Sequence, residues 1–300
     1  MIISTSRPTP ARRAKPWNVW WSHGLRVSLL LLMHAVTLPA WANQRTSAAM
    51  ALREVVACQA TNGQIIQTSI FSSVYDAATR ISVYLPPCYA SETQILPVIY
   101  LLHGANADET QWPDLRVQAA ADALIANGAT PFIVVMPGGT YTQAHDYTAF
   151  ILTDLLPAIA QQFRVSTARS GQAIGGISRG GEYALRIAFG HPDLFVAAGG
   201  HSPVVQSGSD SNLITVAQTA PGIAGLSVLL DVGAADSLQT DTATLAHVVR
   251  DRGGAVRFRV GVGGHNRAYW RANTATYLRL YMTAFATPVT PPTIYTPARC

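Results

Sequence analysis

The chain has 300 residues, of which 49% are hydrophobic and 12% are charged. This balance excludes a disordered protein, which needs low hydrophobicity and a high charge content, and the length allows one large domain or two small ones. The formal net charge of +5 points towards an anionic partner such as nucleic acid or a membrane surface. Whether such a partner is expected depends on where the basic residues lie in the chain.

The N-terminal segment 1–42 has the three parts of a secretory signal peptide. It carries five basic residues and no acidic residue, and an apolar run of 12 residues follows Arg26. Pro39 and then Ala40-Trp41-Ala42 supply a helix break and the small residues that signal peptidase reads. The run is too short for a membrane span of about 20 residues, although an uncleaved anchor is the alternative. We expect cleavage near Ala42 and export to the periplasm, the cell envelope or the medium.

Removal of this segment changes the charge argument. The 258 residues that remain hold 16 arginines, 16 acidic residues and no lysine, so the expected mature chain is close to neutral. The most basic stretch, 250–259, also contains Asp251 and does not make a nucleic-acid patch. We therefore expect no nucleic-acid partner, and no stable membrane span after signal cleavage.

Three cysteines, Cys58, Cys88 and Cys300, follow the signal segment. They lack the Cys/His spacing of a zinc site, so no metal is expected. In an oxidising compartment one disulfide is expected. Cys58 and Cys88 flank two predicted strands and are suited to closing that hairpin, but Cys300 is an open alternative partner for either.

The remaining chain consists of a lead-in at 43–59, one domain at 60–286 and a Pro-rich tail at 287–300. Two early strands, 64–71 and 80–85, are joined by a turn. Short apolar strands then alternate with amphipathic helices, which indicates a parallel sheet covered on both faces. In chain order we expect a strand at 97–102, a helix at 117–127, a strand at 132–136, a helix at 147–163, a strand at 172–177, a helix at 181–189, strands at 195–198 and 227–232, a helix at 242–252, a strand at 256–262 and a helix at 267–284.

An antiparallel pair followed by this alternation predicts an α/β fold with a mostly parallel, doubly wound sheet. In such sheets the functional site lies at the carboxyl ends of the strands. The loops after the predicted strands are therefore the places in which to look for chemistry.

The strongest chemical signal is Gly176-Ile177-Ser178-Arg179-Gly180, a G-x-S-x-G motif between an apolar strand and a helix. A bare motif of this kind is weak, but this context is the one that a nucleophilic serine needs. The serine sits on a strained strand-to-helix turn, and the glycines let the neighbouring backbone pass close to it. A phosphate-binding loop would need G-x-G-x-x-G or a lysine, and neither is present.

A serine nucleophile needs a base that is oriented by an acid. Asp236 follows the predicted strand 227–232, and His265 follows the strand 256–262. Both fall in loops at strand carboxyl ends, in the order Ser, Asp, His that is typical of α/β hydrolases. We therefore predict a catalytic triad of Ser178, His265 and Asp236.

Other residues compete for these roles. Asp231, inside a strand, is the second choice for the acid. His247 lies within a helix and His191 at a helix end, where packing or capping explains them. The candidate pocket walls, each of which packing would explain equally well, are Trp112, Tyr141, His145, Tyr147 and His201.

The oxyanion hole should use the backbone N–H after the nucleophile, which belongs to Arg179, and one from the loop after the third strand. That loop begins His103-Gly104-Ala105, and Ala105 N–H is the predicted second donor. The imidazole of His103 is expected to brace the loop.

The sequence resembles the esterase family of α/β hydrolases that includes S-formylglutathione hydrolase (esterase D), feruloyl and other acyl esterases, enterochelin esterases and mycolyltransferases. The matching stretches span most of 80–284, and the serine and histidine blocks are the specific ones. They read YLPPCY (84–89), PVIYLLHG (97–104), ETQW (109–112), DLLPAI (154–159), GGISRGGEYAL (175–185), GAAD (233–236) and GGHNRAYW (263–270).

The resemblance implies the α/β-hydrolase fold and a serine esterase that acts on small-molecule esters through an acyl-enzyme, with no metal or organic cofactor. The family triad carries over to Ser178, Asp236 and His265. The predicted export signal argues against the role of an S-formylglutathione hydrolase, which the resemblance implies is cytosolic. Two alternatives stay open: an acyltransferase that uses the same triad, and a non-catalytic envelope or binding protein on a hydrolase scaffold.

Overall fold

The computed structural model describes residues 58–141, 144–206 and 212–286. The expected signal peptide at 1–42, most of the lead-in, the tail at 287–300 and Cys300 lie outside the described residues. In the part that is described, no helix is long and apolar enough to cross a bilayer.

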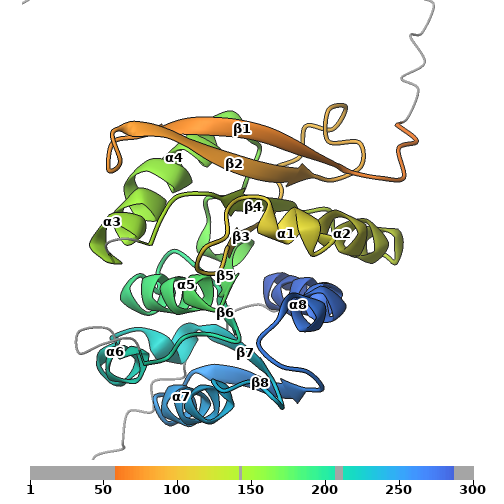
Figure 1. The fold of residues 1–300 in the computed structure, drawn as a ribbon. Coiled ribbons are helices and arrows are strands. Elements are labelled where there is room, and N and C mark those ends of the chain that lie inside the picture. The colour runs from red at the N-terminus through yellow and green to blue at the C-terminus, as the bar shows by residue number, and fades with distance from the viewer. Residues whose placement is uncertain (1–57, 142–143, 207–211, 287–300) are drawn as a thin grey trace, which may run out of the picture. The chain divides into compact units, whose positions relative to one another are not determined.

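A single eight-stranded sheet forms the centre of this region (Figure 1). The strand order is β1-β2-β4-β3-β5-β6-β7-β8. β1 and β2 form an antiparallel hairpin, and β2 is also antiparallel to β4, while all pairs from β4 to β8 are parallel. The strands are β1 (Gln64–Ser72), β2 (Ala77–Leu85), β3 (Val98–Leu102), β4 (Ile133–Pro137), β5 (Gln172–Ile177), β6 (Ala197–His201), β7 (Ser227–Gly233) and β8 (Ala255–Gly261).

Helices cover both faces of the sheet, as the doubly wound prediction requires (Figure 1). One buried apolar cluster joins the sheet to the helices from α3 to α7, and a second joins it to α1, α2 and α8. The helices are α1 (Gln111–Asp114), α2 (Val117–Ala126), α3 (Ala144–Ala149), α4 (Leu156–Gln162), α5 (Arg179–Gly190), α6 (Leu213–Thr219), α7 (Gln239–Asp251) and α8 (Arg267–Ala286). The predicted α/β-hydrolase architecture is confirmed.

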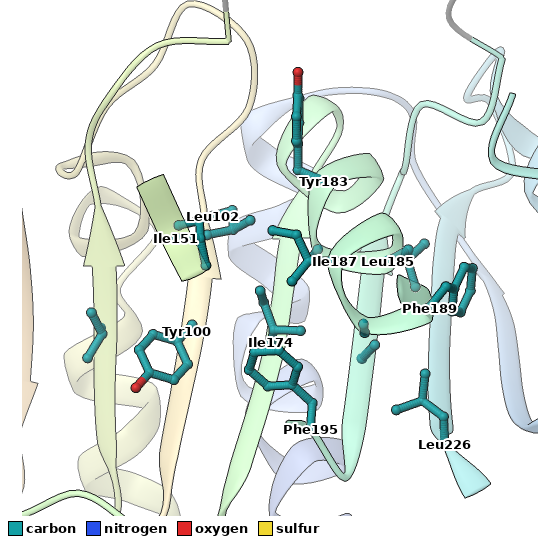
Figure 2. Close-up of a cluster of buried hydrophobic side chains, with 14 of the residues drawn as sticks. Tyr100, Leu102, Ile151, Ile174, Tyr183, Leu185, Ile187, Phe189, Phe195 and Leu226 are labelled. Atoms are coloured by element: carbon teal, nitrogen blue, oxygen red, sulfur yellow. The ribbon is translucent and has the colours of Figure 1, made fainter. Parts of the chain in front are cut away.

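The helix α5 packs on the centre of the sheet, directly after the predicted nucleophile. Figure 2 shows Ile187 of this helix above Ile174 of β5 and Phe195, which precedes β6, and Phe189 beside Leu185 in the same buried cluster. All these side chains are buried. Because burying an aliphatic or aromatic side chain contributes about 1.5–3 kcal/mol, this packing fixes the turn between β5 and α5 firmly on the sheet.

Several elements differ by one to three residues from their predicted bounds, and two of these differences have a physical reason in the structure. The helix predicted at 147–163 begins at Ala144 and contains a π-helical turn, Phe150–Leu155, between α3 and α4. The wider turn ends just before Pro157, which has no N–H to donate to a preceding carbonyl. A long helical pattern in the sequence does not reveal such a change in winding.

The strand predicted at 195–198 begins two residues later and ends three residues later, since β6 covers Ala197–His201. Gly199 and Gly200 made this stretch resemble a loop. A Cβ at Gly199 would lie 1.9 Å from the Tyr281 hydroxyl, and one at Gly175 on β5 would lie 1.7 Å from it. The glycines therefore make room for a tyrosine of α8 and do not mark a turn.

A disulfide joins Cys58 to Cys88, with a Cα–Cα distance of 5.6 Å. The same N-terminal stretch is held by hydrogen bonds to α2. Gly63 N–H donates to Asp122 at 2.8 Å, and Gln118 donates to Gly63 O at 2.8 Å. Covalent and polar contacts together anchor the chain just before β1.

Candidate active site

Ser178 occupies the turn between β5 and α5 with φ 55° and ψ −115°, a conformation that is unfavourable for a residue with a side chain. The glycines on either side explain how the turn fits. A Cβ at Gly176 would lie 2.4 Å from the Gly180 carbonyl carbon, and a Cβ at Gly180 would lie 2.3 Å from His103 O. The strained, half-buried serine is the geometry expected of a nucleophile elbow.

The structure brings the three predicted triad residues together. His265 Nε2 lies 3.0 Å from Ser178 Oγ, and His265 Nδ1 lies 3.0 Å from Asp236 Oδ2. The Asp236 side chain is fully buried, whereas the His265 side chain is 34% exposed. A serine nucleophile needs a histidine base that an acid orients. The buried Asp236 and the partly exposed His265 have this arrangement.

The loops that carry Asp236 and His265 are fastened to each other. Ala235 N–H donates to Gly263 O at 2.8 Å, and Gly233 packs so closely on Gly263 that a Cβ there would lie 2.4 Å from the same oxygen. Asp236 Oδ1 accepts from Leu238 N–H at 2.9 Å. This bond leaves Oδ2 for the imidazole and fixes the direction of the carboxylate.

The other side of the histidine ring meets Trp270 of α8. The two rings are edge to face with centroids 5.0 Å apart. Trp270 Nε1–H donates to Ser202 Oγ at 3.2 Å, so the indole is itself held in place. Trp270 therefore packs against the imidazole of His265, a contact that its residue type alone did not indicate.

Asp231, the second choice for the acid, has other partners. Its Oδ1 accepts from the hydroxyls of Tyr269 (2.9 Å) and Tyr277 (2.7 Å), and its Oδ2 lies 2.6 Å from Arg259 Nε. Burial, and then the negative charge of Asp231, raise the pKa of both tyrosines. Asp231 therefore belongs to a buried network beside the site, and Asp236 is the carboxylate in contact with His265.

A pocket of about 390 Å³ is lined by the loop after β3 and by the residue that follows the serine in the chain. Ala105, Gly139, Thr140, Tyr141 and Arg179 are among the residues that line it. Ala105 and Arg179, whose N–H groups are the predicted oxyanion donors, thus face one cavity. A somewhat larger cavity, of about 420 Å³, is lined at the amino ends of β7 and β8 and is remote from this chemistry.

Three of the predicted pocket walls are wrong. Trp112, Tyr147 and His201 are almost completely buried, with exposures of 1%, 0% and 0%. His201 is the last residue of β6, and its ring stacks on Tyr277. Their polar and aromatic character suggested a binding surface, but each fills the interior. The side chain of His145 is outside what the structure describes.

His103 is also buried, with 2% exposure, and its Nδ1 lies 2.8 Å from Gly104 O. Burial is the main cause that lowers the pKa of this imidazole. The Tyr141 hydroxyl donates to His103 O. These contacts are those of a residue that braces the loop after β3, as expected.

One ion-pair group at the site was not anticipated. Glu182, in the first turn of α5, is 2% exposed and lies 2.7 Å from Arg179 Nη1 and 3.1 Å from Arg186 Nη2. The spacing i, i+3 and i+4 places such residues on one helix face. The spacing of Arg179, Glu182 and Arg186 is present in the sequence, but a G-x-S-x-G motif does not by itself indicate an ion-pair group.

Within residues 58–141, 144–206 and 212–286, no group of three or more His, Cys, Asp or Glu side chains is arranged to hold a metal ion.

The sheet order, the elbow and the Ser–His–Asp contacts define an α/β hydrolase. The family model described as "Putative esterase" matches residues 72–280. The chain therefore belongs to this esterase family, as the resemblance predicted.

Curated relatives agree with this assignment. The chain is 31% identical over 153 residues to an endo-1,4-beta-xylanase/feruloyl esterase of Xylanibacter ruminicola, covering 45% of this chain and 21% of that protein. It is 28% identical over 145 residues to esterase Rv1288 of Mycobacterium tuberculosis, covering 45% and 31%. The matched part is thus about a fifth to a third of the length of these relatives.

Solved structures share the fold. A ferulic acid esterase aligns with a TM-score of 0.69 and 24% identity, covering 75% of this chain and 99% of the other. S-formylglutathione hydrolase from Staphylococcus aureus aligns with a TM-score of 0.65 and 21% identity, covering 75% and 98%.

Proposed function

We propose that this protein hydrolyses carboxylic esters of small molecules through an acyl-enzyme on Ser178, with His265 as the base and Asp236 as the orienting acid. The observation that carries the proposal is the pair of 3.0 Å contacts that His265 makes, one with each partner. Membership of the esterase family supports the same reaction class.

In the first half of the reaction, Ser178 Oγ attacks the ester carbonyl carbon while His265 Nε2 takes the hydroxyl proton. Asp236 accepts a hydrogen bond from Nδ1–H, which fixes the imidazole tautomer and stabilises the imidazolium. The carbonyl oxygen becomes an oxyanion. The backbone N–H groups of Arg179 and Ala105 are the proposed donors to it, and each donor of this kind contributes about 3–4 kcal/mol to the transition state.

Collapse of this intermediate breaks the ester C–O bond, and His265 returns its proton to the leaving alcohol. A water molecule then attacks the acyl-enzyme, His265 takes a proton from the water, and the second collapse releases the carboxylic acid and restores Ser178. Each proton that the imidazole accepts is given back within the same half-reaction, so no metal or redox cofactor enters the balance.

The first test is hydrolysis of 4-nitrophenyl acetate by the wild-type protein and by Ser178→Ala and His265→Ala. We expect both changes to lower kcat by at least about 10⁴-fold, because the triad acts as a unit. His247→Ala is the matched control, since this exposed histidine of α7 hydrogen-bonds to Arg250 and lies outside the Ser178–His265–Asp236 contacts. Undiminished turnover in Ser178→Ala would refute the proposal.

The natural ester is a separate question. Because one relative is named as a feruloyl esterase, feruloyl esters belong in a panel with acetyl-sugar and glyceryl esters. Addition of an acceptor alcohol to the same assays separates hydrolysis from acyl transfer. Free acid as the main product supports the hydrolase, and a transferred ester as the main product supports the acyltransferase alternative.

We also propose that the protein is exported. The basic and apolar segment 1–42 supports this, as does the Cys58–Cys88 disulfide, because disulfides persist in oxidising compartments. Fractionation of cells that express the full chain, followed by N-terminal sequencing, tests it. A mature N-terminus near Asn43 in the exported fraction is expected, and full-length protein in the cytoplasm would contradict it.

A further inference from the structure

We propose that the Arg179 side chain forms an anion subsite beside Ser178, and that the enzyme prefers esters whose acyl or alcohol part carries a carboxylate. This inference rests on the proposed esterase function and adds the charge of the substrate to it. The guanidinium acts on the ester through its side chain, independently of the Arg179 backbone N–H.

The position of Arg179 is the first part of the argument. It follows the nucleophile directly in the chain and lines the same 390 Å³ pocket as Ala105 and Tyr141. Its side chain is 34% exposed, so it is reachable by a ligand and yet partly shielded from water. A charged side chain that lines the pocket next to the nucleophile turn can act on a substrate that enters it.

The hydrogen bonds of Arg179 are the second part. A guanidinium has five N–H donors. The only side-chain partner of Arg179 among the described residues is Glu182, at 2.7 Å from Nη1. The remaining donors are therefore open to a ligand, while the bond to Glu182 fixes the orientation of the group.

The local charge is the third part. Glu182 uses one carboxylate oxygen for Arg179 and the other for Arg186, so one negative charge is shared between two guanidinium groups. Among the residues whose side chains the structure describes, none of those that line the pocket is acidic. A guanidinium whose carboxylate partner also contacts a second guanidinium, in a pocket whose described lining has no carboxylate, is complementary to an anionic ligand.

Carboxylate is the anion that suits this site best, because the planar guanidinium binds it through parallel N–H···O bonds. Partial exposure limits the strength of the contact through screening by water and salt. The structure thus favours a several-fold preference for anionic esters over neutral ones, rather than an absolute requirement.

Two matched ester pairs test the proposal, each differing by one charge and one methyl group. On the acyl side, the 4-nitrophenyl monoester of adipate is compared with its methyl ester. On the alcohol side, 3-acetoxybenzoate is compared with methyl 3-acetoxybenzoate. The readout is the ratio of kcat/KM for the anionic ester to that for the neutral ester, and the pair with the higher ratio identifies the side on which the anion binds.

Arg179→Gln should lower this ratio by about fivefold to tenfold in at least one pair, as expected for loss of a partly exposed charge-assisted hydrogen bond. Arg186→Gln is the matched control. It removes the same charge from the same Glu182, but Arg186 is not among the residues that line the pocket. The ratio should therefore be retained in Arg186→Gln.

A second measurement needs no variant. If Arg179 attracts the substrate carboxylate, raising NaCl from about 0.05 to 0.5 M should lower the ratio in the wild-type protein. A wild-type ratio near one in both pairs would overturn the subsite, and so would equal ratios in the two arginine variants. Failure to hydrolyse the neutral esters, with Ser178 unreactive, would instead refute the esterase function itself.

Discussion

The buried histidine His201 provides a sharp test of how the sheet supports the site. Its ring is 0% exposed, stacks on Tyr277 with centroids 3.7 Å apart, and faces the Tyr281 hydroxyl at 3.0 Å from Nε2. Burial, followed by the nearby charge of Arg259, lowers the pKa of His201 from 6.5 to about 3. The folded protein therefore keeps this imidazole neutral at a pH where the unfolded chain protonates it.

The sign of the effect follows from linkage. Above about pH 6.5 the ring is neutral in both states and contributes no pH dependence. As the pH falls from 6.5 towards 3, the unfolded state takes up a proton that the folded state does not, so the free energy of unfolding decreases. With the two pKa values above, the decrease is about 2 kcal/mol at pH 5.

The assay is urea unfolding of the wild-type protein and of His201→Gln at pH 8 and pH 5, with the disulfide kept oxidised. Gln is neutral throughout and can still hydrogen-bond to Tyr281. Lost packing should make the variant less stable at pH 8, but its fall in unfolding free energy between the two pH values should be smaller than that of the wild type by about 2 kcal/mol. His103 and the other titrating groups are common to both proteins and cancel. An identical pH dependence in the two proteins would refute the reasoning.

Two further predictions distinguish residues that act in catalysis from residues that stabilise the fold. Asp236→Asn should lower kcat by about 10⁴-fold with little change in unfolding free energy, because the wrong imidazole tautomer is then favoured. Asp231→Asn should instead destabilise the fold by about 1–3 kcal/mol, because its buried hydrogen-bond partners lose a charged acceptor. The opposite pattern would mean that the acid is misassigned. Gly175→Ala should destabilise the protein by about 1–3 kcal/mol or more through overpacking against Tyr281, whereas Gly190→Ala, where a Cβ meets nothing within 4 Å, should leave the thermal midpoint unchanged or raised; equal effects would contradict the close packing.

The fold was largely predictable because its strands are short, apolar and separated by amphipathic helices. The elbow at Ser178 and the loops of Asp236 and His265 were predictable for the same reason, since each follows an apolar run that marks a strand end. These are local signals. They require only that the sheet is parallel and that its carboxyl edge carries the site.

The pocket walls were not predictable, because burial depends on what packs against a residue from elsewhere in the chain. His201 looked like a loop residue since Gly199 and Gly200 precede it, but these glycines accommodate Tyr281, 80 residues further along. Trp112 likewise looked like a binding aromatic, whereas its indole N–H donates to Leu102 O inside the molecule. Contacts with residues 80 positions away for His201 and ten positions away for Trp112 decided the two cases.

The most direct test of the central claim is labelling by a fluorophosphonate probe, followed by intact mass measurement and peptide mapping. The geometry around Ser178 predicts one label per folded chain, on Ser178 Oγ, because His265 activates this hydroxyl from 3.0 Å away. The label should be absent from Ser178→Ala and strongly slowed in His265→Ala. An unlabelled folded protein, or a label that persists in Ser178→Ala, would contradict the account.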